Sequence, residues 1–198
     1  KTELNWNKLV SDAYWKRVKL SEKGHYATPE IHFDKTKEKG HPFAYHVYGT
    51  AITVAKVDTL RGTYEIEKVN IVHDFGKSMN ILLDKGQIEG ALIQGIGWLT
   101  IEEIRHNEKG QLLANALSTY KVPDIHSVPK EVNIKELETE SSKHAILKSK
   151  AVGEPPFIYG TGSFFAIQNA IKTFNPHYKP DYNAPMTHEK VLTGLYQK

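Results

Sequence analysis

The sequence predicts an α+β fold in which helices pack against a mixed β-sheet. Residues 44–57 and 63–76 are rich in β-branched and aromatic side chains and alternate as strands do. Apolar residues at helical spacing follow over residues 82–104 and 163–174. Because the predicted strands and helices are intermixed without strict βα alternation, the pattern favours the α+β class.

The N-terminal part of the chain predicts one helix and little other regular structure. Residues 4–18 place apolar side chains at near-helical spacing, which indicates a short amphipathic helix. Residues 24–33 are expected to be an extended piece broken at Pro29. The charged segment that follows, residues 35–42, is expected to be a loop.

The two strand segments are expected to form a hairpin, because residues 58–62 between them supply a turn. The helix that follows carries Gly90, Gly95 and Gly97. Each glycine costs roughly 1 kcal/mol relative to alanine in a free helix. Something is therefore expected to pack tightly against that face of the helix.

The remaining elements are expected near the helix ends and in the second half of the chain. Residues 73–80 combine turn and capping residues before the glycine-containing helix, with Ser78 or Asn80 as its cap. Residues 132–137 are a strand candidate. The last helix, over residues 187–196, is expected to begin at Thr187 as N-cap.

Length and composition restrict the class of protein. With 198 residues, 39% hydrophobic and 25% charged, the chain is expected to be a soluble globular protein of one or two domains. The net charge of +3 is too small to indicate a nucleic-acid partner. No signal peptide and no stretch long enough to cross a bilayer are found, so no membrane partner and a cytoplasmic location are expected. The missing initial methionine leaves a fragment or a processed piece open.

Cysteine and histidine content argue against a metal centre built from the chain's own side chains. The chain has no cysteine, which excludes disulfides, iron–sulfur clusters and thiolate zinc sites within it. Its ten histidines are scattered without a recognisable zinc spacing, so hydrogen-bonded or surface roles are favoured. The glycine pairs at 95/97 and 160/162 lack the continuation of a dinucleotide-binding loop.

A single carboxylate lies in residues 153–156, between one glycine and two prolines. Proline fixes its own φ and pushes the preceding residue out of the helical region, so Pro155 is expected to hold Glu154 stiffly outside that region. Such a residue suits a catalytic or ligand-binding role. A surface turn is the alternative that composition leaves open.

The neighbours of Glu154 favour catalysis. Ala151, Val152 and Phe157 are apolar and are expected to desolvate the carboxylate, as suits a general base. Gln94, in the glycine-containing helix, is either a packing amide or a ligand donor, and composition does not choose between these roles.

Four segments of the chain resemble, in order, one known family. They are DKGQIEGALIQGIGWLTIEEI at residues 84–104, STYKVPDIHSVPKEVNI at 118–134, KAVGEPP at 150–156 and FFAIQNAI at 164–171. All four resemble the C-terminal region of the molybdenum-cofactor-binding subunit of xanthine dehydrogenases, within the xanthine oxidase and aldehyde oxidase family. The likeness extends over nearly the whole chain, so residues 1–198 are expected to be the C-terminal portion of that subunit's molybdopterin-binding domain.

The resemblance implies a molybdenum cofactor-binding fold and a set of site residues. Glu154 would be the general base in the hydroxylation of purines such as hypoxanthine or xanthine. Gln94 would donate to molybdopterin, and the glycines of residues 92–99 would be close-approach positions. No side chain of this chain is expected to ligate the metal. The backbone groups that would run beside the cofactor belong to Lys150, Ala151, Val152 and Gly153.

The same resemblance implies partners. The upstream half of the molybdopterin subunit would supply further cofactor-binding and purine-clamping residues, and 2Fe-2S clusters and FAD would lie on other domains or subunits. The chain is therefore expected to be an oxidoreductase fragment or subunit, inactive alone, with possible subdomains at about residues 1–80 and 81–198. Aldehydes or other N-heterocycles as substrates, and a non-catalytic free-standing binding module, are the alternatives. The electron acceptor, NAD or oxygen, and the oligomeric state are left open.

Two places depart from the family pattern. Ile81 stands where a proline is usual, and residues 159–166, YGTGSFFA, replace a more apolar stretch. Both departures concern local turn geometry and leave Glu154 in place.

Overall fold

The computed structural model describes residues 5–139 and 143–198. The chain divides into two compact units, Lys1–Pro42 and Phe43–Lys198. The boundary expected near residue 80 does not appear, because elements on both sides of that position share one hydrophobic core.

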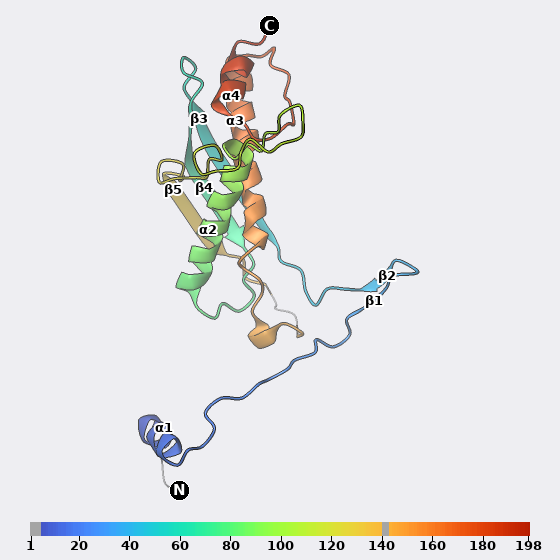
Figure 1. The fold of residues 1–198 in the computed structure, drawn as a ribbon, viewed down its shortest axis with the longest axis vertical. Coiled ribbons are helices and arrows are strands. Elements are labelled where there is room, and N and C mark those ends of the chain that lie inside the picture. The colour runs from blue at the N-terminus through green and yellow to red at the C-terminus, as the bar shows by residue number, and fades with distance from the viewer. Residues whose placement is uncertain (1–4, 140–142) are drawn as a thin grey trace. The chain divides into compact units, whose positions relative to one another are not determined.

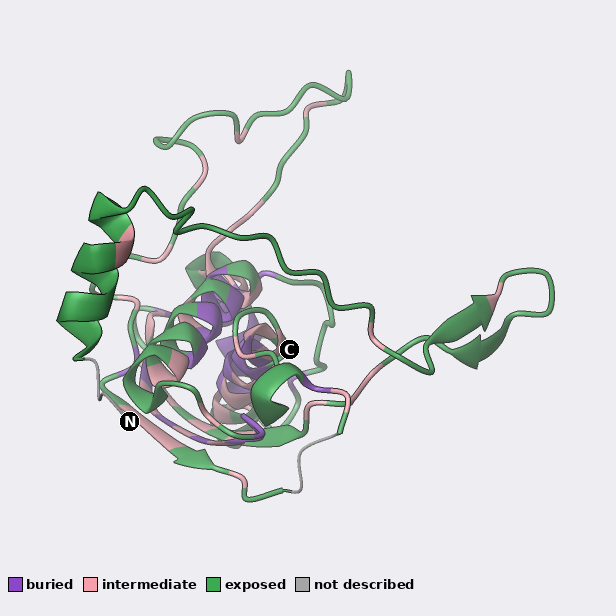
Figure 2. Cartoon of the chain, turned by 90° about the horizontal axis from the view of Figure 1, so that it is seen from below, coloured by how far each residue is buried: buried purple, intermediate pink, exposed green. Residues whose placement is uncertain are grey.

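The first unit carries the predicted N-terminal helix. It is α1, Trp6–Trp15, and it begins where the Asn5 side chain accepts a hydrogen bond from the Asn7 amide. None of residues 5–42 is buried, so the apolar side chains of α1 lie exposed in this chain. Figure 2 shows α1 almost entirely in the colour of exposed residues.

The first unit also contains a short hairpin. Strand β1, His32–Asp34, pairs antiparallel with β2, Lys39–His41. The prediction of a loop over residues 35–42 was therefore wrong for its last part. The reason is local: Asp34 Oδ1 accepts a hydrogen bond from the Thr36 amide at 2.9 Å, which closes a turn and returns the chain as β2.

The second unit is built on a three-stranded sheet in the order β3-β4-β5 (Figure 1). The predicted hairpin is confirmed: β3, Gly49–Val57, pairs antiparallel with β4, Tyr64–His73. Strand β5, Glu131–Glu136, lies parallel to β4, with Val132 opposite Val69. The sheet is therefore mixed, as predicted.

Helices cover one face of this sheet (Figure 1). The predicted caps are confirmed, because Asn80 accepts from the first-turn amides of the helix that begins at Ile81 and Thr187 accepts from the Lys190 amide in the last helix. Among the described helices, none is both long and apolar enough to cross a membrane. The α-helices are α2, Ile81–Thr100, α3, Thr161–Phe174, and α4, His188–Leu195, and the 3₁₀ turns are η1, Ile146–Lys148, and η2, Pro155–Gly160.

The core of the second unit lies between β4 and the helices (Figure 2). Along the last part of β4, Val69, Ile71 and His73 are buried in alternation, as one face of a strand requires. This alternation places a histidine inside the core at the end of the strand. The helices contribute Ile88, Leu92 and Ile96 from α2, Ile167 and Ile171 from α3, and Val191 and Leu195 from α4.

The tight packing expected on the glycine-containing helix is confirmed at Gly95 and Gly97 but was wrong for Gly90, where nothing lies within 4 Å of an added Cβ. A Cβ added to Gly95 would lie 2.3 Å from the Phe157 carbonyl oxygen, and one added to Gly160 would lie 2.3 Å from the backbone of Gly95. Gly97 is packed against Pro123 in the same way. The glycines therefore admit protein backbone and side chains, whereas the close approach implied by the resemblance was that of a cofactor.

Substituting alanine on α2 tests this contact. Gly95→Ala is expected to lower the free energy of unfolding by about 2 kcal/mol, because its methyl group must displace the backbone of η2. Gly90→Ala is the matched control: nothing lies within 4 Å of its Cβ, so the variant should gain up to about 1 kcal/mol from helix propensity. Urea unfolding followed by circular dichroism measures both, and equal effects of the two substitutions would contradict the packing argument.

Candidate functional site

A pocket of about 300 Å³ lies between α2 and the segment that enters η2. Its walls bring together three of the residues singled out from the sequence, Gln94, Gly153 and Glu154. The rings of Trp98 and Phe157, with centroids 4.5 Å apart, form an apolar part of the lining. Residues far apart in the sequence thus share one concave surface.

Glu154 occupies the position just before η2. Its backbone lies in the helical region, at φ −92° and ψ −36°, and its carbonyl accepts from the Phe157 amide at 3.0 Å. The prediction that Pro155 excludes this region was therefore wrong. Prolines are tolerated in the first turn of a helix, where their missing N–H has no partner to lose, and the hydrogen bond to Phe157 draws Glu154 into that turn.

The Glu154 side chain is exposed in this chain and makes no capping hydrogen bond. Its apolar neighbours do not cover it, because Ala151 is itself exposed while Val152 and Phe157 are half-buried. The expected desolvation of the carboxylate is thus wrong for this chain taken alone. Glu154 lines the pocket and is open to solvent.

Hydrogen-bond donors stand free beside Glu154. Within the described residues, the amides of Ala151, Val152 and Gly153 donate to no other group. Gln94 is exposed and lines the pocket. Of the two roles left open by composition, this position favours a ligand donor over a buried packing amide. Gln94 and Gly153 line the pocket itself, so their donors are available to a polar ligand there.

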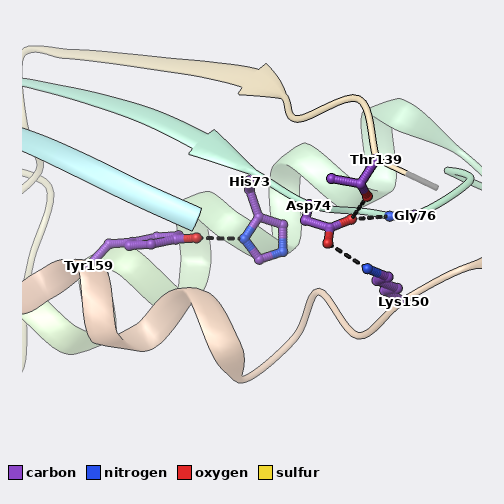
Figure 3. A network of polar contacts seen from close by, with 6 residues as sticks. All are labelled: His73, Asp74, Gly76, Thr139, Lys150 and Tyr159. Atoms are coloured by element: carbon purple, nitrogen blue, oxygen red, sulfur yellow. Dashed lines mark hydrogen bonds and ion pairs between the residues drawn. The ribbon is translucent and has the colours of Figure 1, made fainter. Parts of the chain in front are cut away.

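Lys150 differs from the other predicted residues. Its side chain is buried and its Nζ lies 2.5 Å from Asp74 Oδ2, which is fully buried (Figure 3). Its backbone amide donates to the Phe75 carbonyl at 2.8 Å. Lys150 is therefore held by the protein behind the pocket, and only its carbonyl stays available for the predicted cofactor contact.

Asp74 is the centre of this buried group (Figure 3). Its Oδ1 accepts from the Thr139 hydroxyl at 2.7 Å and from the Gly76 amide at 2.9 Å. Burial alone would raise the pKa of Asp74, but the hydrogen bonds from Lys150, Thr139 and Gly76 outweigh it, and its pKa is lowered. The carboxylate stays charged and fully paired.

His73, next to Asp74, faces the other end of the loop. Its Nδ1 lies 2.7 Å from the Tyr159 hydroxyl oxygen in η2. Its Nε2 is buried and has no hydrogen-bond partner of acceptable geometry among the described residues. Burial lowers the pKa of His73, against the smaller opposite effects of the Ala151 backbone and the Asp74 charge, and burial raises the pKa of Tyr159 to about 12.

Three residues of this buried layer were not among the predicted site residues: His73, Asp74 and Tyr159. Alternation within the predicted strand segment, residues 63–76, would have indicated that His73 points inward, as a polar residue in a core position. Nothing local to the sequence indicates the pairing of Asp74 with Lys150. In the described part of the chain, no three His, Cys, Asp or Glu side chains gather as metal ligands.

Comparisons with known proteins link the chain to one family. Residues 1–129 match the family described as a molybdopterin cofactor-binding domain. Xanthine dehydrogenase 2 of Arabidopsis thaliana is 39% identical over 84% of the chain, and the xanthine dehydrogenase/oxidase of Felis catus is 39% identical over 94%. The chain spans only 13% and 15% of these two relatives.

Solved structures agree with the predicted fold class. The aldehyde oxidoreductase of Desulfovibrio desulfuricans matches 81% of the chain with a TM-score of 0.67 and 30% identity, over 17% of its own chain. Quinoline 2-oxidoreductase of Pseudomonas putida matches 73% with a TM-score of 0.65 and 25% identity, over 18% of its own chain. The α+β fold of a molybdenum cofactor-binding domain is therefore confirmed.

The buried ion pair between Lys150 and Asp74 is expected to contribute to the free energy of unfolding. Lys150→Met leaves the Asp74 carboxylate buried without its cation, and is expected to lower the free energy of unfolding by about 3 kcal/mol. Lys68→Met is the control, because it removes the solvent-exposed pair with Glu131 and should cost less than about 1 kcal/mol. Similar losses in urea unfolding of the two variants would show that the buried pair has no special weight.

The lowered pKa of His73 is expected to make the free energy of unfolding depend on pH. Its folded pKa lies below the ordinary 6.5, so the unfolded chain binds the proton more readily and the free energy of unfolding falls as pH drops below that value. His188, whose pKa burial also lowers, adds to the same window, whereas Asp74 contributes only below its ordinary 3.8.

Urea unfolding at a series of pH values between about 5 and 8 tests this assignment. His73→Gln should reduce the slope of unfolding free energy against pH, while replacement of the exposed His41 by asparagine should leave the slope as in the wild type. An unchanged slope in His73→Gln would mean that the buried histidine is not the group responsible.

Proposed function

Since the chain belongs to the molybdopterin cofactor-binding domain family, we propose that it forms one wall of the cofactor site in a xanthine dehydrogenase-like molybdenum hydroxylase. The observation that carries this proposal is the pocket in which Gln94, Gly153 and Glu154 meet. The relatives are several times longer than the chain, so the activity belongs to a larger protein of which this wall is one part.

The residues at the pocket fit a pterin cofactor. Pterin rings and their phosphate carry many hydrogen-bond acceptors, and the Gly153 amide and the Gln94 side chain at the pocket are donors. The amides of Ala151 and Val152, just before Gly153 in the chain, would extend this set. Gly153 has open space before it, since only Gln87 lies within 4 Å of an added Cβ. A planar ligand at that point would therefore meet no side chain other than that of Gln87.

The bound cofactor would supply the redox chemistry of the hydroxylation. The part assigned to this chain is proton transfer at Glu154, whose carboxylate would take up the proton that the attacking oxygen loses. A general base must lie within about 3 Å of the proton it removes. The first turn of η2 and the contact of α2 with η2 give Glu154 a defined backbone position for that purpose.

The proposed substrate is a purine such as hypoxanthine or xanthine. Two of the matched relatives, 39% identical, are named for xanthine, whereas the matched aldehyde and quinoline oxidoreductases are 25–30% identical. An aldehyde or another N-heterocycle is the second candidate, favoured by those structures. A non-catalytic binding module would use the hydrogen-bond donors but would leave the Glu154 carboxylate without a role.

The proposal includes partners and a location. The rest of the molybdopterin subunit would complete the cofactor pocket and clamp the purine, and 2Fe-2S and FAD domains or subunits would carry electrons away. The chain alone would turn nothing over, because most of the pocket is supplied by those parts. A cytoplasmic setting suits such an assembly.

The decisive variant is Glu154→Gln in the assembled enzyme, produced in a host that makes the molybdenum cofactor. We expect kcat for purine hydroxylation to fall by at least about a thousandfold, as for loss of a general base combined with its charge, while molybdenum content stays at the wild-type level. Glu108→Gln, at an exposed position away from the pocket, is the control and should retain full activity. Activity near wild type in a molybdenum-loaded Glu154→Gln enzyme would make residues 153–156 a structural turn.

A further inference from the structure

We propose that His73 and Asp74 are positioning residues for Glu154, because they hold the two ends of the segment that carries it. Both stand at the C-terminal end of β4, outside the pocket. One binds Lys150 at the start of the segment and the other binds Tyr159 at its end (Figure 3). The inference rests on the role proposed for Glu154 and deepens it.

The first anchor combines a buried ion pair with backbone pairing. Besides the bond between Asp74 and Lys150, residues 148–150 run antiparallel to residues 75–77, with the Lys77 amide donating to the Lys148 carbonyl at 2.7 Å. At the start of this anchor, Leu147 and Lys148 adopt positive φ values of 52° and 62°. Such a backbone persists only where its surroundings hold it, and the anchor supplies that constraint.

The second anchor fixes the end of η2. The Tyr159 hydroxyl lies against His73 Nδ1 and over Gly49 of β3, where an added Cβ would stand 1.7 Å from that oxygen. Only glycine at this position admits the phenol. Tyr159 is buried, so the surrounding residues fix the position of its ring. The backbone at the end of η2 is held in place with it.

The contact of His73 with the segment is the one at Tyr159. Its Nδ1 points to the Tyr159 hydroxyl (Figure 3). Among the described residues, the buried Nε2 makes no hydrogen bond of acceptable geometry.

Among the described residues, no hydrogen bond holds the Glu154 side chain in place. It is exposed and its side chain makes no capping hydrogen bond, so the position of its carboxylate follows from the backbone between the anchors. Catalytic groups must be held within fractions of an ångström of their productive place by the residues behind them. The buried pairs of His73 and Asp74 are those residues.

Tyr159→Phe is the sharpest test, because it removes one hydroxyl and keeps the ring. In the assembled, cofactor-loaded enzyme we expect kcat to fall about tenfold to a hundredfold with KM changed less than about threefold. Hydrogen exchange of residues 150–160 should become faster, and molybdenum content should stay at the wild-type level. Tyr120→Phe, which loses a hydroxyl bonded to Glu102 elsewhere, is the control and should match the wild type in all three readouts.

Two further variants separate positioning from a general structural effect. His73→Gln retains a polar group opposite Tyr159 and should recover most of the rate that His73→Leu loses. In the Glu154→Gln background, Tyr159→Phe should slow the reaction no further, because its effect passes through Glu154. An equal loss in both backgrounds, or no loss in either, would overturn the positioning role.

Comparing these variants with Glu154→Gln alone shows whether the proposed function or only the positioning role is wrong. If Glu154→Gln is as active as the wild type, the proposed function fails at its base. If Glu154→Gln is inactive while Tyr159→Phe and His73→Leu keep wild-type kcat and exchange rates, only the positioning role fails.

Discussion

The direct contact of α2 with η2, where Gly95 and Gly160 meet backbone to backbone, is the constraint on which the site depends. Gln94 lies next to Gly95 in the chain, and η2 begins just after Glu154. Because no side chain separates the two elements, the amide of one and the carboxylate of the other border the same pocket. Glycine at position 95 destabilises the helix itself, but it is the residue that allows the backbone of η2 to approach this closely.

Behind the pocket the structure separates polar groups by burial. The charged group assigned to chemistry, Glu154, is exposed, while the pair Asp74 and Lys150 is almost completely shielded from solvent. A shielded carboxylate with every oxygen bonded is rigid, and it stays charged without a catalytic use. The buried residues Asp74 and Lys150 thus hold the structure in place, while the exposed Glu154 remains available to a ligand.

Most of the fold could be predicted from the sequence, because its signals are local. Alternation indicated β3 and β4, apolar spacing indicated α2 and α3, and capping side chains such as Asn80 and Thr187 marked where helices begin. The short strand β2 was missed, since a charged segment carries no strand pattern and its formation depends on the turn at Asp34.

The site was predictable only in part. The residues bordering the pocket came from motif resemblance, which names residues but not their surroundings. Apolar neighbours in sequence suggested a desolvated Glu154, yet neighbours along a chain need not cover one another in space. The bonds of Asp74 to Lys150 and of His73 to Tyr159 join distant positions, so no local pattern predicts them.

In the proposed site the cofactor lies against the amides of residues 151–153, and hydrogen exchange tests this placement most directly. Exchange of peptides covering residues 150–157 would be compared between the cofactor-loaded and the cofactor-free enzyme, with residues 105–113 as the internal reference. We expect slower exchange in the first segment when the cofactor is loaded and no change in the second. Equal exchange of residues 150–157 in both forms would place the cofactor elsewhere.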